Sequence, residues 1–256
     1  MKKISCLLFI ISLFLIPLSA SSLYERLLNK ETISVATEGT YPPFTYHNKE
    51  GKLTGYDVEV TRALAKELGV KLKFHETSWD SMLLGLKAGR FDMVANQVSL
   101  NTKKRQATFD EALAYSYSST IMVVRKDEER IKDIDDIKGL KVANALSSVY
   151  GELALKYHAK VISIDSMGQA LLLVQQKRAD LTLNNSLAVL DYLNSHKNSP
   201  LKIAWESKDK QRASLVINKH QEKALELINN AMQKLIDKGV LKRLGEQFFG
   251  KDVSNK

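Results

Sequence analysis

Two rounds of apolar strands and amphipathic helices organise this chain. In the first round, short apolar runs over 33–36, 70–74 and 91–98 are typical of strands. Between them, 57–68 and 81–88 place apolar residues at helical spacing, and a glycine follows each of these two segments. Asp57 is expected to cap the first of these helices. This β-α-β-α-β order predicts a mostly parallel sheet with helices on its faces.

A second round follows after a continuous apolar strand at 120–124 and a charged segment at 127–137 that is expected to hold a short helix. Its alternating strands and helices cover 140–145, 148–158, 161–164, 167–176, 179–184 and 186–194. The chain then continues through extended segments at 201–205 and 214–217 and helices at 221–238 and 241–248. The pattern R-x-D-x-x-x-N occurs in both rounds, at Arg90–Asn96 and Arg178–Asn184. This echo supports two α/β lobes of the same design.

The first strand is followed by a stiff, aromatic-rich loop at 38–46. Pro42 and Pro43 forbid both a helix and a continued central strand. Because open α/β sheets bind ligands at the carboxyl ends of their strands, the rings of Tyr41 and Phe44 are candidate ligand contacts. The alternative is a surface turn whose rings simply cover the core.

Residues 1–22 have the features of a secretory signal peptide: early lysines, an apolar run and then small residues. Cleavage is expected after Ala20 or Ser22. An uncleaved membrane anchor is the weaker alternative, because the apolar run at 6–16 is short for a bilayer, which takes about 20 apolar residues. The only cysteine, Cys6, lies inside this segment. The exported chain is therefore expected to have no disulfide, no cysteine metal site and no lipid-attachment cysteine.

Composition and charge narrow the classes of function. The chain has 256 residues, of which 44% are hydrophobic and 26% charged, as in an ordinary globular protein of one or two domains. The formal net charge is +9, but the lysines are scattered, so nucleic-acid binding is not expected. The five histidines show no metal-ligand spacing, and no nucleophile elbow or glycine-rich phosphate loop is present. We therefore expect no metal, no cofactor and no enzymatic activity.

Binding has better candidates than catalysis. Polar or aromatic side chains at predicted strand ends make up the first group: Tyr41, Phe44, Trp79, Asn96, Gln97, Ser99, Asn184, Asn185 and Ser186. The amides and hydroxyls among them could instead serve turn chemistry alone.

A second group suits a carboxylate ligand. Ser147 and Ser148 stand where a strand turns into a helix, and such a helix start offers free N–H groups and a positive dipole end. Arg105 could add a bidentate clamp on the same carboxylate. The alternatives are a plain helix cap for the two serines and a surface position for the arginine.

Five motifs occur in order along the chain: E-G-T-Y-P-P-F at 38–44, L-T-G-Y-D-V-E at 53–59, W-D-S-M-L at 79–83, N-Q-V-S at 96–99 and L-N-N-S-L-A at 183–188. Together they resemble the periplasmic solute-binding proteins for polar amino acids of ABC importers. The cystine- and cysteine-binding branch of that family is the most similar. The resemblance covers essentially the whole chain after the predicted signal peptide.

The resemblance implies the type II periplasmic-binding-protein fold, in which two α/β lobes close on a ligand held in the cleft between them. Lobe 1 would be 23–121 plus 218–256 and lobe 2 would be 122–217, joined by a two-segment hinge. The protein would be a monomeric, non-enzymatic periplasmic receptor without a lipid anchor. It would capture a polar amino acid, cystine or cysteine first, and deliver it to an ABC permease in the inner membrane.

Residue roles also follow from the resemblance. Tyr41 and Trp79 would wall the amino acid, Gln97 and Ser99 would contact its polar groups, and N–H groups near Ser148 would help an arginine to hold its α-carboxylate. Counting from Ser99 gives the arginine position to Lys104, whereas counting from Asn101 and Thr102 gives it to Arg105. Arg105 is preferred, because a lysine cannot reproduce the bidentate fork.

One departure from the family pattern concerns the second lobe. The acid that usually receives the α-ammonium falls on Asn185, whose amide supplies no countercharge. Glu38 is a possible substitute for that acid. Two rival functions also remain at this point: a periplasmic enzyme on the same scaffold, similar to cyclohexadienyl dehydratase, and a ligand sensor or adhesin.

Overall fold

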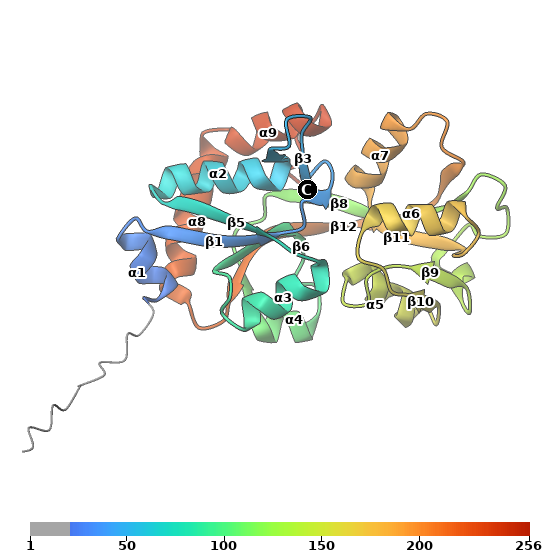
Figure 1. Ribbon diagram of the computed structural model, residues 1–256, viewed down its shortest axis with the longest axis horizontal. Coiled ribbons are helices and arrows are strands. Elements are labelled where there is room, and N and C mark those ends of the chain that lie inside the picture. Colours follow the sequence, from blue (N-terminus) through green and yellow to red (C-terminus); the bar gives the residue numbers. More distant parts are fainter. Residues whose placement is uncertain (1–20) are drawn as a thin grey trace, which may run out of the picture.

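The computed structural model describes residues 21–256 as two α/β lobes side by side (Figure 1). The predicted signal peptide lies outside the described residues except for Ser21 and Ser22. Ser22 caps the first helix, α1 (Leu23–Leu28). Its hydroxyl accepts the Glu25 N–H at 3.2 Å, and the Glu25 carboxylate accepts the Ser22 N–H at 2.8 Å. Within 21–256, no helix combines the length and the apolar character that crossing a membrane requires.

The first lobe is built on three parallel strands with β1 (Thr32–Thr37) in the middle. It pairs with β5 (Lys71–Glu76) on one side and β6 (Met93–Val98) on the other. The helices of this lobe are α1, α2 (Tyr56–Leu68), α3 (Trp79–Lys87), α4 (Lys103–Thr108), α8 (Glu222–Asp237) and α9 (Val240–Phe249). The last two pack on α2, so the end of the chain returns to complete the lobe that its beginning started (Figure 1).

The second lobe repeats the parallel pattern on a smaller scale. Here β9 (Lys141–Ala143) lies between β10 (Lys160–Ile162) and β11 (Leu181–Asn185). The helices α5 (Val149–Lys156), α6 (Met167–Gln175) and α7 (Ser186–Ser195) pack around these strands, and the predicted helix in the charged segment is a short 3₁₀ turn, Ile134–Ile137.

Two long antiparallel strands, β8 (Ser116–Arg125) and β12 (Leu201–Asn218), pass between the lobes as a pair. They make one sheet of the order β10-β9-β11-β8-β12-β6-β1-β5, with β7 (Phe109–Glu111) added at β12. The expected separate segments 201–205 and 214–217 are therefore one strand. The strongly charged stretch between them is not typical of a strand, so the sequence did not predict this continuity. The register of the pair shifts between Glu206 and Lys210.

The R-x-D-x-x-x-N echo has the same structural role in both lobes. The Asp92 carboxylate accepts the Ser34 N–H at 2.8 Å, beside the start of β1. In the second lobe, the Asp180 carboxylate accepts the Lys141 N–H at 2.8 Å, at the start of β9. Each aspartate thus fixes the strand that follows it against the first strand of its own lobe.

The aromatic-rich loop forms a small sheet of its own, β2 (Thr40–Tyr41), β3 (Thr45–His47) and β4 (Leu53–Thr54). Its placement corrects one prediction. Phe44 is not on an exposed loop; it is fully buried and packs on Phe249 with ring centroids 5.6 Å apart. The apolar ring lies in the core, as in the alternative interpretation of this loop.

Two further details of the local structure differ from the prediction. Asp57 does not cap α2, because the cap position is Gly55 and Asp57 lies fully buried in the first turn. Helix α4, which carries Arg105, was not expected at all.

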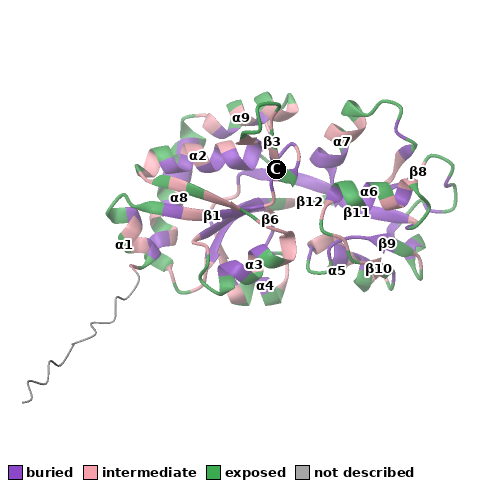
Figure 2. Ribbon diagram, in the orientation of Figure 1, coloured by how far each residue is buried: buried purple, intermediate pink, exposed green. Residues whose placement is uncertain are grey.

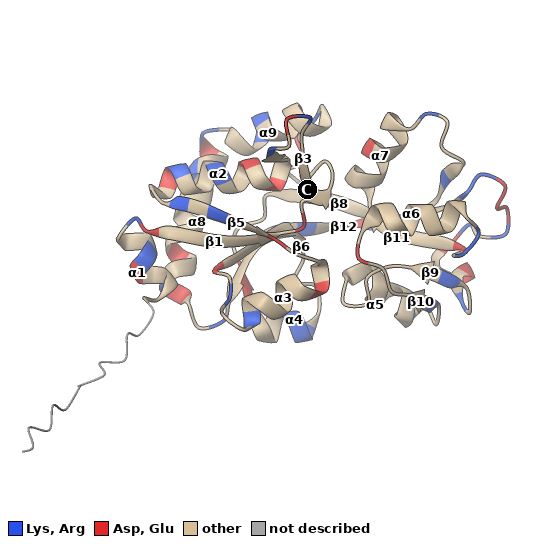
Figure 3. Ribbon diagram, in the orientation of Figure 1, with Lys and Arg blue, Asp and Glu red and all other residues tan. Residues whose placement is uncertain are grey.

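Burial and charge follow the layered plan. The strands are mostly buried and the outer faces of the helices exposed (Figure 2). Lysines and arginines are spread over α2, α3, α4 and α9 and over the far end of the second lobe, and do not form one block in this view (Figure 3).

Candidate ligand-binding cleft

A cleft of about 570 Å³ lies between the lobes, where β1, β6, β9 and β11 end. Strands of both lobes deliver polar residues to it at their carboxyl ends, as expected for open α/β sheets.

The first lobe contributes two rings and a carboxyl group. Tyr41 and Trp79 line the cleft, with Glu38, Asn96 and Gln97 beside them. Asn96 holds Glu38 in place: its Nδ2 donates to the Glu38 carboxylate at 2.6 Å, and its Oδ1 accepts the Glu38 N–H at 2.9 Å.

Glu38 is a titratable group in the cleft wall. Burial raises the pKa of its carboxyl to about 7, and the nearby Asp80 charge adds to this rise, while the hydrogen bond from Asn96 opposes it. A cation placed beside Glu38 would favour the ionised form of this carboxyl.

Arg105 is the cationic residue of the cleft wall within the described part of the chain. It is 5% exposed, and its guanidinium carbon lies 5.7 Å from the centroid of the Trp79 ring. Nη1 donates to the Ser99 carbonyl at 2.9 Å, and Nη2 donates to the Ser147 carbonyl in the other lobe. Because a guanidinium has five N–H donors, further donors are available for a carboxylate. Its neighbour Lys104 is exposed and does not line the cleft.

The second lobe offers the start of α5 to the same space. Ser148 caps this helix through a hydroxyl that accepts the Gly151 N–H at 3.0 Å. Ser148, Val149 and Tyr150 line the cleft, so the first turn of the helix faces it. An added Cβ at Gly151 would lie 2.3 Å from the Ala145 carbonyl oxygen, so glycine is required for the turn to pack this closely. A helix start in this position favours a bound anion.

The two walls also touch each other directly. The Tyr41 hydroxyl donates to Asn184 Oδ1 at 2.7 Å. The Ser147 hydroxyl donates to the Asp80 carboxylate at the rim. Together with the contact between Arg105 and Ser147, these bonds join the lobes across the cleft.

Five of the residues expected to bind ligand do not line the cleft. Phe44 lies in the core, and Ser99 and Ser147 support Arg105 through their carbonyl oxygens. Asn185 lies behind the wall, where it caps α7 by accepting the Leu187 N–H at 2.9 Å, and Ser186 is the first residue of that helix. The other eight, Glu38, Tyr41, Trp79, Asn96, Gln97, Arg105, Ser148 and Asn184, do line it.

Sequence reasoning missed several lining residues of the second lobe: Asn144, Tyr150, Ile164, Asp165, Ser166 and Met167. Asn184, by contrast, was a candidate because it stands at the end of a predicted strand. The loop between β10 and α6 carries no comparable signal. In residues 21–256, no three or more His, Cys, Asp or Glu side chains come together as a metal site would need.

Comparison with known proteins identifies the relatives of this chain. The sequence profile of the bacterial extracellular solute-binding proteins, family 3, matches residues 33–251. The L-cystine-binding protein TcyA of Bacillus subtilis is 42% identical over 233 residues, which cover 91% of this chain and 86% of that protein.

Two solved structures are informative as a pair. The L-cystine solute receptor of Neisseria gonorrhoeae, in its unliganded open conformation, is 54% identical and covers 92% of this chain and 100% of its own, with a TM-score of 0.62. An ancestral arginine-binding protein bound to arginine is only 29% identical, over 86% of this chain and 98% of its own, yet its TM-score is 0.80. The less similar sequence thus has the more similar overall arrangement.

Proposed function

This chain belongs to the bacterial extracellular solute-binding proteins, family 3, and on that premise we propose that it captures L-cystine for an amino-acid ABC importer. Membership of this family implies an exported protein with a small-molecule ligand and a permease partner. The proposal of cystine, with cysteine as the nearest alternative, rests on the names of its relatives and on the chemistry of the cleft.

The observation that carries the proposal is the buried Arg105 between both lobes of the cleft. Its remaining donors and the start of α5 suit one carboxylate of an amino acid. Glu38 suits an ammonium group, which makes it the candidate for the countercharge that Asn185 cannot supply. Tyr41 and Trp79 offer apolar surface to the part of the ligand that lies between these charges.

Closure of the lobes on the ligand is part of the proposal. The three bonds across the cleft and the higher TM-score against the arginine-bound relative support a closed arrangement in this structure. We assign lobe 1 to 23–121 plus 218–256 and lobe 2 to 122–217, with β8 and β12 as the hinge. We further propose that the protein is a periplasmic monomer, that its signal peptide directs its export and is then removed, and that it carries no lipid anchor.

The proposal is tested by ligand-dependent stability of the chain from residue 21. At a cystine concentration of 100 times the Kd, the free energy of unfolding should rise by about 2.7 kcal/mol. Because the sole cysteine precedes residue 21, a reductant leaves the protein unchanged and converts cystine to cysteine. Loss of the stabilisation on adding reductant identifies cystine as the ligand, and persistence identifies cysteine. No stabilisation by any amino acid would contradict the transport function.

A matched pair of variants tests the role of Arg105. Arg105→Ala should weaken cystine binding by roughly thirtyfold or more, because a desolvated charge pair is worth about 2–5 kcal/mol. Lys104→Ala, one residue away on the exposed face of α4, should leave the affinity unchanged. Equal effects of both variants in isothermal titration calorimetry would contradict the assignment.

The enzyme alternative is separable in the same samples. A receptor returns its ligand unaltered, so mass spectrometry of cystine after prolonged incubation should recover it quantitatively. Time-dependent conversion that Arg105→Ala abolishes would favour the enzyme.

A further inference from the structure

A buried carboxylate outside the cleft wall connects to the cleft through Gln97. Asp57 in α2 is fully buried, and one of its oxygens accepts the Gln97 N–H at 2.6 Å. Its other oxygen accepts Gln97 Nε2 at 2.7 Å. Asp57 therefore holds both the main chain and the side chain of a residue that lines the cleft.

The conformation of Gln97 requires this support. Its φ is +51°, in the left-handed region, which is strained for a residue with a Cβ. The two hydrogen bonds to a buried carboxylate offset that strain. They also fix the position of the strand end from which Gln97 faces the cleft.

Asp57 also sets the direction of the Gln97 amide. Burial raises the pKa of the Asp57 carboxyl to about 7, and its hydrogen bonds with Gln97 oppose this rise. In its ionised form, above that pKa, the carboxylate only accepts hydrogen bonds, so Nε2 must face Asp57 and Oε1 must face away. Oε1 accordingly accepts from Ser116 Oγ at 2.9 Å in β8 and from Asn185 Nδ2 at 3.4 Å in the second lobe.

The side-chain amide of Asn185 offers a donor to the Gln97 oxygen that faces it. Its Oδ1 is taken by the Leu187 N–H at the start of α7, which turns its Nδ2 toward the first lobe. Nδ2 donates to Ser118 Oγ at 2.7 Å as well as to Gln97. An aspartate here has no donor to offer, and its second oxygen would face Gln97 Oε1, acceptor against acceptor.

We propose that Asp57 is a positioning residue for ligand binding, which fixes the Gln97 amide, and that Asn185 replaces the family's aspartate because it is the donor that this amide direction requires. This inference rests on the proposed function, since it assigns the determinants of the same cleft. It also gives a role to the L-T-G-Y-D-V-E motif, whose aspartate does not cap its helix.

A double-mutant cycle between positions 57 and 185 tests the inference. Asp57→Asn should weaken cystine binding by about tenfold, because an amide there opposes a donor to Gln97 Nε2. Asn185→Asp should weaken it similarly. In the double variant, the Gln97 amide can rotate so that Oε1 accepts from the new amide and Nε2 donates to the new carboxylate. Its affinity should therefore return to within about threefold of the wild type.

A second readout keeps the inference independent of the ligand. All hydrogen bonds of this chain join residues of the protein itself, so the same cycle should be non-additive in the midpoint of urea unfolding of the free protein. Glu59→Gln, an acid-to-amide change in α2 away from the cleft, is the matched control for binding and should leave the cystine affinity unchanged.

Three outcomes would overturn the inference. They are additive effects in both readouts, unchanged binding by Asp57→Asn, and tighter binding by Asn185→Asp, which would mean that the second lobe lacks only a countercharge. The last outcome needs no Asp57 variant, so the test holds even if Asp57→Asn does not fold. A wild type that binds no cystine contradicts the proposed function instead, and the unfolding cycle still decides the inference.

Discussion

At the scale of single residues, the cleft depends on which of three consecutive basic side chains points inward. Thr102 caps α4 by accepting the Arg105 N–H at 3.3 Å, so the helix begins at Lys103. Within this short helix, Lys103 and Lys104 are exposed and Arg105 is buried. The direction of a side chain follows from the phase of the helix that carries it.

Tyr41 provides a residue-scale prediction. Tyr41→Phe keeps the ring in the cleft wall but removes the hydroxyl that donates to Asn184. Because a hydrogen bond of this kind contributes about 1 kcal/mol, cystine affinity should fall by about fivefold, mainly through faster dissociation. Stopped-flow release kinetics measure the change.

The control for that prediction is Tyr46→Phe, in the same small sheet but outside the cleft wall. It should release cystine at the wild-type rate. An unchanged rate in Tyr41→Phe would mean that the bond across the cleft does not contribute to retention.

Sequence reasoning reached the aromatic and amide residues of the first lobe because they stand at the ends of clearly patterned strands. It could not place Phe44, since the same proline-rich loop directs Tyr41 to the cleft and Phe44 to the core. It also could not place Asn185, whose side chain points away from the wall that Asn184 lines. Consecutive residues of a regular strand face opposite sides, so one residue of phase decides whether Asn184 or Asn185 lines the cleft.

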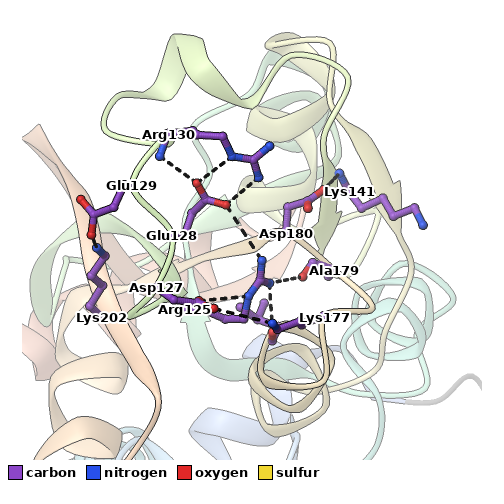
Figure 4. A network of polar contacts seen from close by, with 11 residues as sticks. Arg125, Asp127, Glu128, Glu129, Arg130, Lys141, Lys177, Ala179, Asp180 and Lys202 are labelled. Carbon is purple, nitrogen blue, oxygen red and sulfur yellow. Dashed lines mark hydrogen bonds and ion pairs between the residues drawn. The ribbon is translucent and has the colours of Figure 1, made fainter.

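At the scale of elements, a network of ion pairs secures the segment after β8 (Figure 4). Glu128 is 5% exposed and accepts two hydrogen bonds from the Arg130 guanidinium, at 3.0 and 2.7 Å. Arg125 extends the network by donating to the carbonyl oxygens of Val174, near the end of α6, and of Ala179, shortly before β11. The network thus ties the end of β8 and the following loop to a helix of the second lobe.

This network predicts a specific acid sensitivity. The hydrogen bonds from Arg130 lower the pKa of Glu128 to about 2 from its usual 4.5. A lowered pKa stabilises the fold above pH 4.5, and this contribution is lost as the pH falls from 4.5 through 2. The free energy of unfolding of the wild type should therefore fall more steeply over that window than that of Glu128→Gln. Urea unfolding at a series of pH values measures both slopes.

Glu129→Gln is the matched control for this experiment. Its carboxylate is exposed and pairs with Lys202 at 2.8 Å on the surface. The Glu129→Gln variant should keep nearly the wild-type slope. Identical slopes in the wild type and Glu128→Gln would contradict the role of the Glu128–Arg130 pair.

At the scale of the whole molecule, the strand and helix order predicted from periodicity gave the two-lobe architecture, because each lobe is built from local β-α-β units. The continuity of β12 was not predictable in the same way. Residues 206–212 are largely polar and exposed, and their strand conformation comes from pairing with β8 rather than from their own pattern.

The rim contact between the lobes predicts a shift in their opening. Ser147→Ala removes the hydroxyl that donates to Asp80. The closed population of the ligand-free protein should fall by about fivefold relative to the open one, because about 1 kcal/mol of closing energy is lost. Small-angle X-ray scattering should report a larger radius of gyration without cystine and a wild-type value with it. Ser163→Ala, an exposed serine outside the cleft wall, should scatter like the wild type in both conditions, and the same result for Ser147→Ala would contradict the prediction.

The paired passage of β8 and β12 between the lobes has a mechanical consequence. Two strands laddered together flex out of their common plane far more readily than they slide along it, in the manner of a leaf spring. The register of the two strands shifts near Ser207, where Ser207 Oγ instead accepts the Thr120 N–H at 2.9 Å. The strand pair is therefore expected to bend most easily at this point. The two lobes would then open and close along a single arc. One pair of distance labels, with one label on each lobe, would suffice to measure how far they are open.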